Sequence, residues 1–216
     1  QKKAAQQKYR IQRAQLPGLT RAAERYVRAE VKEARKQAAK ASGGRTTADF
    51  LALMNVYYRT LPDAIRREMS PVLRGYFDML TGALSDEVGE FNERQMHQLT
   101  HELQAFEDRL VETHVRFSRD SLAKLIRESS AEGVWDSIAA RLDEWESSRA
   151  ESIADLTSIG FNSEISRAGY GLFGISRLVN MKMTAISCPI CDPLNGQIAH
   201  GTPPNHGGCS CVLVAA

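Results

Sequence analysis

The 216-residue sequence lacks several features that would place it in a common functional class. It has no run of about 18 apolar residues, so we expect no membrane-spanning helix. Its first residues are polar and basic without an apolar core, which argues against a signal peptide. Neither G-x-S-x-G nor a glycine-rich phosphate loop with a lysine occurs, and the H-x-E of zinc deaminases is missing. We therefore expect a protein that is not an enzyme.

Histidine is also sparse, with five residues in the chain. His101 and Glu102 begin the H-E-x-x-H pattern of zinc proteases, but position 105 is alanine, so that motif is excluded. His97, His101 and His114 have no carboxylate or cysteine partners at a fixed spacing. We interpret these three as surface or packing residues.

Cysteine is confined to the C-terminal region, where all four residues lie within 24 positions. A C-x-x-C formed by Cys188 and Cys191 is followed by an H-x-x-C-x-C formed by His206, Cys209 and Cys211. Thiolates and imidazole are the usual ligands of tetrahedral zinc, and two short turns that each present a pair can close such a site. We predict that four of these five residues bind zinc. The ion would be structural, because a cysteine-rich shell leaves no open position for water.

Two other uses of the cysteines are considered. Two disulfides would staple the same segment, although clustered cysteines in a chain without an export signal favour a metal. A redox C-x-x-C is typical of a βαβ setting, and no such pattern surrounds Cys188. His200 is a weaker ligand candidate. The Asn195-Gly196 pair predicts a tight hairpin turn that brings the two halves of the motif together.

The C-terminal half also carries the motifs of a known family. They are R-A-E-S-I-A at 149–154, N-S-E-I-S-R-A-G-Y-G at 162–171, C-P-I-C-D-P-L-N-G-Q-I at 188–198 and P-P-N-H-G-G-C-S-C at 203–211. Over about residues 118–214 the chain resembles the phage Mu F-like minor head protein family, the head-morphogenesis proteins of tailed phages. The family pattern joins C-x-x-C, L-x-G and P-x-x-H-x-x-C-x-C. The chain departs from the Thr-Glu pair that the family often carries, since Thr157 is followed by Ser158.

This resemblance implies a structural minor head (capsid) protein that acts in head morphogenesis near the portal and the packaged DNA. Its partners would be the portal protein, the major capsid protein or both. Its location would be the capsid interior at the portal vertex of the virion, after assembly in the host cytoplasm. A zinc-containing enzyme or toxin-like effector carried by a phage is the alternative, and it would need an open zinc position. A host zinc protein that binds nucleic acid would need residues that read sequence or structure, and we find none.

The charge of the chain is divided unevenly. Residues 1–45 hold 13 Lys and Arg against 3 Glu, a net charge of +10, whereas the remainder carries −8. One side of the helix predicted over 19–41 presents five basic residues at helical spacing, namely Arg21, Arg25, Arg28, Lys32 and Arg35. Such a helix binds double-stranded DNA through its phosphates or an acidic protein surface, although a solvated face of an ordinary helix has the same pattern. Without interleaved aromatic residues, a sequence-reading role is not expected.

Helical periodicity continues to about residue 175. Leu16-Pro17-Gly18 predicts a break before the basic helix, and Thr46 to Asp49 has the chemistry of a helix N-cap. The glycines that recur every seven residues around Gly82 would allow close helix approach or mark an interruption, which we favour. Residues 91–130 contain neither proline nor glycine and have a narrow apolar seam. That pattern predicts a long helix packed on a partner helix or on another subunit in an oligomer.

Near the C-terminus the pattern of apolar residues changes from a helical period to a period of two. Residues 178–185 alternate with a period of two, which predicts a strand, and 211–214 is a suitable pairing partner. The predicted fold class is therefore mainly α (α+β), a long-helix body with a small C-terminal β-hairpin zinc-knuckle module. The predicted domains are a basic N-terminal helical arm over 1–45, a helical body over 46–175 and the zinc-knuckle module over 176–216.

Overall fold

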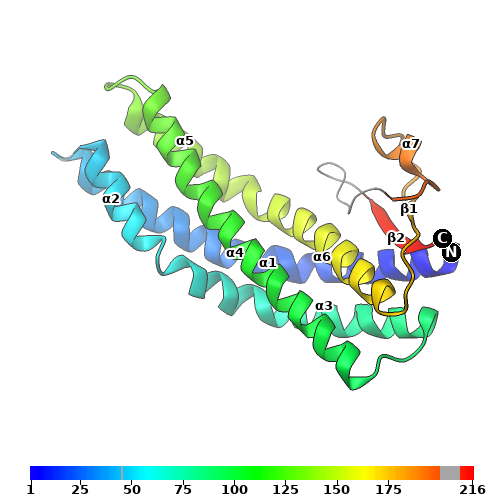
Figure 1. The fold of residues 1–216 in the computed structure, drawn as a ribbon. Helices are drawn as coiled ribbons and strands as arrows, with labels where there is room; N and C mark the ends of the chain where they lie inside the picture. Colours follow the sequence, from blue (N-terminus) through cyan, green and yellow to red (C-terminus); the bar gives the residue numbers. More distant parts are fainter. Residues whose placement is uncertain (45, 200–209) are drawn as a thin grey trace. The chain divides into compact units, whose positions relative to one another are not determined.

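The computed structural model describes residues 1–44, 46–199 and 210–216, and it is mainly helical with one small sheet (Figure 1). The helices are α1 (Lys2–Ser42), α2 (Thr47–Tyr57), α3 (Leu61–Val88), α4 (Glu93–Glu128), α5 (Val134–Glu144), the π-helical turn η1 (Trp145–Arg149), α6 (Ala150–Leu172) and the single turn α7 (Cys191–Leu194). The strands are β1 (Leu178–Lys182) and β2 (Cys211–Ala215). The predicted mixture of long helices and a C-terminal β-hairpin is confirmed.

The first helix differs from the prediction at Pro17. A break was expected at Leu16-Pro17-Gly18, but α1 continues through these residues as one helix. Proline removes one backbone hydrogen bond from a helix. Here the burial of the other side chains of α1 against the core outweighs that loss. The side of the basic segment opposite its charges is apolar and includes Tyr26 and Val27, which are buried. Buried side chains occur along the length of α1.

Among the later helices, the predicted start of α2 is confirmed, whereas the interruption predicted in the region of α3 does not occur. Thr46 and Asp49 form a complete capping box at the start of α2, with the Asp49 backbone N–H donating to Thr46 Oγ1 at 3.2 Å. The interruption expected near Gly82 is wrong, because α3 passes through it. In the same way, α6 continues through Gly160. Each of these helices is long enough for tertiary packing to override one weak helix former.

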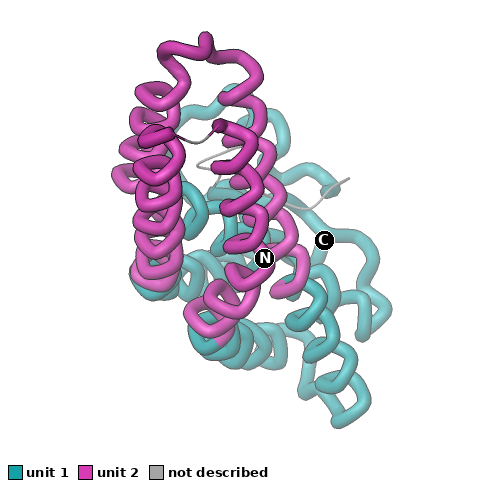
Figure 2. The backbone as a smooth tube through the Cα atoms, turned by 90° about the vertical axis from the view of Figure 1, so that its left-hand side faces the viewer, with its two compact units in different colours: residues 1–19, 71–106, 152–216 teal, residues 20–70, 107–151 magenta. Residues whose placement is uncertain are grey.

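The contacts divide the chain into two compact units, which Figure 2 colours separately. Unit 1 comprises residues 1–19, 71–106 and 152–216, and unit 2 comprises 20–70 and 107–151. Three of the four unit boundaries lie near an irregularity in a helix, at Pro17, at Pro71 and after η1. The predicted domains, an arm over 1–45, a body over 46–175 and a module over 176–216, are continuous segments of the chain, whereas each compact unit combines several segments. That division into domains stays a prediction.

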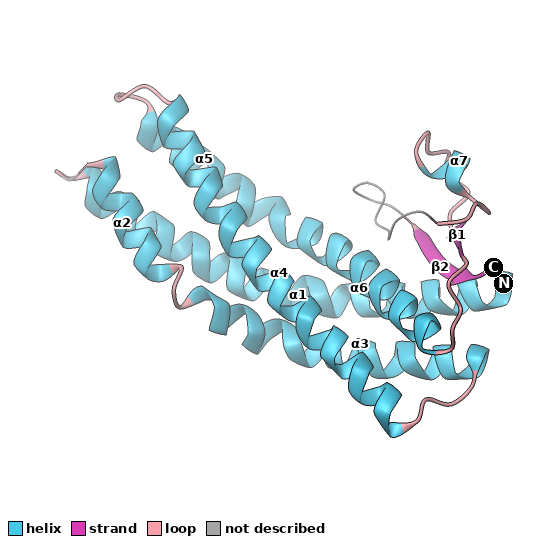
Figure 3. Ribbon diagram, in the orientation of Figure 1, coloured by secondary structure: helices cyan, strands magenta, loops and turns pink. Residues whose placement is uncertain are grey.

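Unit 1 is built around aromatic packing and a small sheet. Tyr76 donates from its hydroxyl to the Ser158 carbonyl at 2.9 Å, and its ring centroid lies 4.9 Å from that of Phe161. The strands β1 and β2 pair antiparallel from Leu178 opposite Ala215 to Lys182 opposite Cys211 (Figure 3). The buried side of this hairpin packs on Ala5 at the beginning of α1. The hairpin is therefore held by the N-terminal turns of the chain.

Unit 2 has its own buried core. Its helices bring together Tyr26 and His114, whose ring centroids lie 4.9 Å apart edge to face, and Phe50 and Trp135, at 6.0 Å. Ile138 and other apolar residues of α5 are fully buried. A polar cluster lies in the same core and is described below.

Candidate functional site

The first half of the cysteine motif forms a turn that Asp192 holds in place. The Asp192 carboxylate accepts hydrogen bonds from the Cys188 backbone N–H at 2.9 Å and from the Ser187 hydroxyl at 3.0 Å, and it is paired with Lys182. The bond from Lys182, followed by the bond from Cys188, holds the pKa of Asp192 below its ordinary value. The carboxylate therefore stays ionised and caps the C-x-x-C turn over the usual pH range.

The same turn directs a backbone donor at a sulfur. The Cys191 N–H donates to Cys188 Sγ at 3.4 Å, and the Asp192 N–H donates to the Cys188 carbonyl at 2.9 Å. Hydrogen bonds of this kind favour the charged form of their acceptor, so an N–H directed at Cys188 Sγ favours the thiolate, which is the metal-binding form of cysteine. The turn thus places one backbone donor at Cys188 Sγ.

The second half of the motif approaches the first through β2. Cys191 and Cys211 are buried in one cluster with Ile159 of α6, and Cys188 packs against it. Residues 20 positions apart in the sequence are therefore gathered at one place. The strand pairing explains this proximity. Cys211 lies opposite Lys182 in the sheet, and Lys182 forms an ion pair with Asp192 of the C-x-x-C turn.

The predicted ligand set is only partly within the described structure. Cys188, Cys191 and Cys211 are described, whereas His206 and Cys209, like the outsider His200, lie outside the described residues. Within ranges 1–44, 46–199 and 210–216, no group of three or more His, Cys, Asp or Glu is arranged to hold a metal ion. The prediction of zinc on four of the five residues therefore stays a prediction.

The Asn-Gly pair forms a different turn from the one expected. Asn195 has φ −64° and ψ 123°, Gly196 has φ 76°, and the Gln197 N–H donates to the Leu194 carbonyl at 3.0 Å. These values define a type II turn, in which the third position requires the left-handed φ that glycine tolerates. The chain then runs along the free edge of β1, where Val179 bridges Ile198. The turn thus adds a short third segment to the hairpin.

Two hollows lie beside the cysteine cluster. One has a volume of about 290 Å³ and is bordered by Lys182, Ile186, Cys188 and Cys191. The other has a volume of about 150 Å³ and a polar lining that includes Gln12, Asp155 and Ser158. Ser210 and Thr184 border both hollows, and the Ser210 and Thr184 hydroxyl oxygens are 3.0 Å apart.

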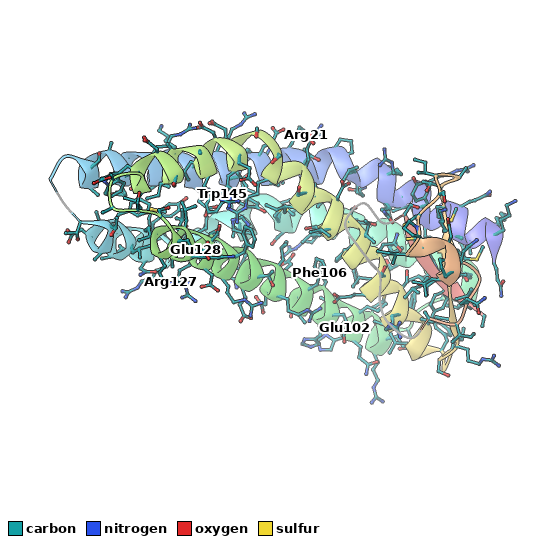
Figure 4. All side chains as sticks on the ribbon, turned by 90° about the horizontal axis from the view of Figure 1, so that it is seen from above. Arg21, Glu102, Phe106, Arg127, Glu128 and Trp145 are labelled. Carbon is teal, nitrogen blue, oxygen red and sulfur yellow. The ribbon has the colours of Figure 1, made fainter. Side chains whose placement is uncertain are left out.

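The basic face of α1 lies in unit 2, and all five predicted residues are exposed. Figure 4 labels Arg21 on the outer side of this helix. Arg25 pairs with Glu68, and Arg35 pairs with both Asp143 and Glu146 at 2.6 Å. A fourth pair, between Arg28 and Glu24 at 3.5 Å, is looser. Acidic side chains of the chain itself therefore already compete for part of this face.

Two buried polar clusters were not anticipated from the sequence. In unit 1, the fully buried Lys8 ammonium lies 3.0 Å from Glu87 and donates to Tyr170 Oη and to the Leu213 carbonyl. The sequence contains an indication that Lys8 is buried. Lys8 falls at helical spacing between Ala5 and Ile11, which are both apolar and buried. A lysine at an apolar position predicts a buried ion pair, but the sequence does not identify its partner.

The second cluster is in unit 2. Glu30, His114 and Arg149 are all buried, with His114 Nε2 at 2.9 Å from Glu30 Oε2 and Arg149 at 3.4 Å from the same oxygen. Arg149 also donates to Ser118 Oγ at 2.7 Å, and its guanidinium carbon lies 4.1 Å from the Trp145 ring centroid. The π-helical turn Trp145–Arg149 places this arginine. For His114, the interpretation as a packing residue agrees with its burial.

Comparison with protein families, curated proteins and solved structures gives no match for the chain. The resemblance to the Mu F-like minor head proteins therefore stays a prediction from the C-terminal motifs. Among the helices that the structure describes, none combines the length and apolarity needed to cross a membrane.

Proposed function

We propose that this chain is a structural protein of a tailed-phage head, of the same kind as the Mu F-like minor head proteins. It would act in head morphogenesis at the portal vertex, in contact with the portal protein or the major capsid protein. A zinc ion held by four of Cys188, Cys191, His206, Cys209 and Cys211 would fix the C-terminal hairpin. The chain would carry out no reaction of its own.

One observation carries the proposal. Two of the described cysteines of the motif on which the family resemblance depends, Cys191 and Cys211, are buried in one cluster, and the partly buried Cys188 packs against it. Cys211 is the first residue of β2 in the two-stranded hairpin. A two-stranded hairpin alone is at best marginally stable in water. The packing of this hairpin on Ala5 and Ile159, together with a closed metal site, would make it a rigid surface for assembly.

The metal part is tested on the full chain by measuring zinc content and the coordination shell by X-ray absorption. We expect one zinc per chain with four sulfur or nitrogen ligands, and we expect Cys188→Ser and Cys211→Ser to lose it. Ser210→Ala is the matched control, because Ser210 directly precedes Cys211 and is not a predicted ligand. A bound water in the shell would instead favour the enzyme alternative, and a chain without metal would contradict the zinc site.

The assembly part needs a separate test. Heads purified from the phage that encodes the chain should contain it in stoichiometric amounts, measured by mass spectrometry. Heads assembled with the Cys211→Ser chain should lack it or be malformed, whereas those with Ser210→Ala should be normal. Complete heads without the chain would contradict the proposal even if zinc is bound.

The basic face of α1 would contact packaged DNA or an acidic partner. Arg25 and Arg35 already have close acidic partners, whereas Arg28 is paired only loosely with Glu24. We therefore expect about three phosphate contacts, from Arg21, Arg28 and Lys32. Three contacts give a slope of log affinity against log salt of about −2.7. Deletion of residues 1–45 is unsuitable as a test, since Lys8 and Glu30 of α1 are fully buried.

Point substitutions test the face instead. The Arg21→Ala, Lys32→Ala chain should bind duplex DNA more weakly and lower the magnitude of the salt slope by about 2. Arg116 and Arg127, which are exposed on α4, supply a control with the same charge change. If both double variants lose the same affinity, the face of α1 has no special role.

The predicted oligomer would use the exposed side of α4. Leu99 and Leu103 of its predicted seam are buried within the chain, but Phe117 is 54% exposed. The seam is thus largely covered by the chain itself, so contact with another subunit would be centred near Phe117. A Phe117→Ser chain that keeps the oligomeric state of the unaltered chain in sedimentation would contradict this part.

A further inference from the structure

Two histidines stand one turn apart on the exposed side of α4. The Nε2 atoms of His97 and His101 are 3.1 Å apart, and the ring centroids are 4.5 Å apart. Both side chains are exposed, and they lie on the stretch of α4 that carries Glu102, labelled in Figure 4. Residues four apart in a helix lie on the same face, so this proximity follows from the α-helix itself.

The spacing of the two nitrogens fits two adjacent ligands of one metal ion. Imidazole nitrogen binds zinc at about 2.0–2.1 Å, and two nitrogens 3.1 Å apart at that bond length subtend an angle of about 100° at the metal. That angle lies between the 90° of an octahedral or square-planar shell and the 109° of a tetrahedral one. Without an ion, the Nε2–H of one ring donates to the unprotonated Nε2 of the other, and that second ring carries its proton on Nδ1.

We propose that His97 and His101 form a surface site for one divalent transition-metal ion. Imidazole ligands suit Cu²⁺, Ni²⁺ and Zn²⁺, whereas Mg²⁺ and Ca²⁺ prefer oxygen ligands. The two Nε2 atoms bind the ion, and water fills the remaining positions. The site is separate from the cysteine motif and does not depend on zinc binding there.

The helix presents the pair in a fixed orientation. Leu99 is fully buried and Leu103 is 6% exposed, so the turn that carries both histidines is anchored on its inner side. Gln95, two residues before His97, donates from Nε2 to the Leu172 carbonyl at 3.1 Å, which fixes the start of α4 on the end of α6. The backbone is already helical, and binding therefore costs mainly the rotamer freedom of two side chains.

Nickel is the probe of choice, because it is paramagnetic and is not readily reduced by cysteine thiols. Ni²⁺ is titrated into the full chain while backbone amide signals are followed by NMR. We expect saturable broadening of amides over 93–105, separate from any effect over 178–199 or 210–216. The location of the broadening distinguishes this site from the cysteine module.

The matched variant is Gln98→His with His101→Gln, which keeps the composition of the chain and moves one imidazole off the shared face. Positions 97, 98 and 101 are all exposed, so the fold should be retained. We expect Ni²⁺ affinity over 93–105 to fall at least about tenfold, equivalent to about 1.4 kcal/mol. Equal affinity in the two chains would overturn the proposal, and so would displacement of Ni²⁺ by excess Mg²⁺.

Discussion

His114 Nε2 lies 2.9 Å from Glu30 Oε2 in the core of unit 2, and the two side chains are almost completely buried. Burial alone raises the pKa of Glu30, but the hydrogen bond with His114 and the charge of Arg149 outweigh it and lower that pKa. Burial lowers the pKa of His114. We infer that Glu30 is ionised, Arg149 balances its charge, and His114 is neutral with its proton on Nε2.

Loss of the Glu30 carboxylate should strongly destabilise the fold. In Glu30→Ala the Arg149 guanidinium stays buried without its counter-charge, and breaking a buried pair in this way costs about 3–5 kcal/mol. Urea unfolding of the full chain measures the change. Arg66→Ala is the control, because it breaks an exposed 2.9 Å pair with Asp108 and should cost about 0.2–1 kcal/mol. Similar losses in the free energy of unfolding for Glu30→Ala and Arg66→Ala would show that the buried cluster stabilises the fold no more than an exposed ion pair does.

His114 should make stability fall on mild acidification. The unfolded histidine takes up a proton below about pH 6.5, whereas the folded one resists because burial lowers its pKa. The unfolded state therefore binds more protons below pH 6.5, and the free energy of unfolding drops by up to about 1.4 kcal/mol per pH unit. Glu30, whose folded pKa is lowered, adds its own loss only below about pH 4.5.

The variant His114→Gln isolates this effect. Its free energy of unfolding, measured by urea at pH 7.5, 6.5 and 5.5, should change less with pH than that of the unaltered chain. Gln98→Ala, at an exposed position without a titratable side chain, should keep the original slope. Parallel pH profiles for the unaltered chain and His114→Gln would contradict the assignment of a neutral buried imidazole.

The sequence predicted helices and strands well where a local signal acts alone. The capping box of Thr46 and Asp49, the uninterrupted stretch that became α4, and the alternation that became β1 all depend on nearest neighbours along the chain. The helix breaks expected at Pro17 and Gly82 failed for the opposite reason. At those positions packing between distant segments exceeds a local cost of about 1–3 kcal/mol.

The sequence singled out the cysteines of the candidate site but not the residues on which they pack. The C-x-x-C identified Cys188 and Cys191 as a pair, but nothing near them in the sequence identified Ile159 as the residue that they pack on. In the same way, the partners of Lys8 lie 79 to 205 positions away, and only the fold brings them together. Periodicity reports which side of a helix is buried, not which residue faces it.

Lys8 should make stability rise with pH in mild alkali. Burial lowers the pKa of Lys8 to about 8, although Glu87 opposes the shift. The unfolded lysine keeps its proton up to about pH 10.4, so between pH 8 and 9.5 the unfolded state binds more protons and the folded state gains stability. Relative to Lys8→Met, the unaltered chain should gain about 1 kcal/mol per pH unit in urea unfolding. Lys3→Met, at an exposed position, should leave the profile unchanged, and a flat difference for Lys8→Met would contradict the shift.

Two glycines in unit 1 separate the effect of close packing from that of helix propensity. A Cβ added at Gly169 of α6 would lie 2.9 Å from Leu84 Cδ1 and 3.4 Å from Phe91 Cζ, whereas one added at Gly75 of α3 meets nothing within 4 Å. Both alanine variants gain up to about 1 kcal/mol of helix propensity. Only Gly169→Ala must displace Leu84, which is fully buried, at a cost of about 1–3 kcal/mol.

Gly75→Ala should therefore be more stable than the unaltered chain, and Gly169→Ala should be less stable than Gly75→Ala by about 1–3 kcal/mol in urea unfolding. A Gly169→Ser chain should fall at least as far as Gly169→Ala, because the added hydroxyl increases the overlap with Leu84. Equal stability of Gly75→Ala and Gly169→Ala would mean that α6 does not approach Leu84 as closely as 2.9 Å implies. In that case the described packing of α6 would be wrong, and with it the contact of Ile159 with Cys191 and Cys211.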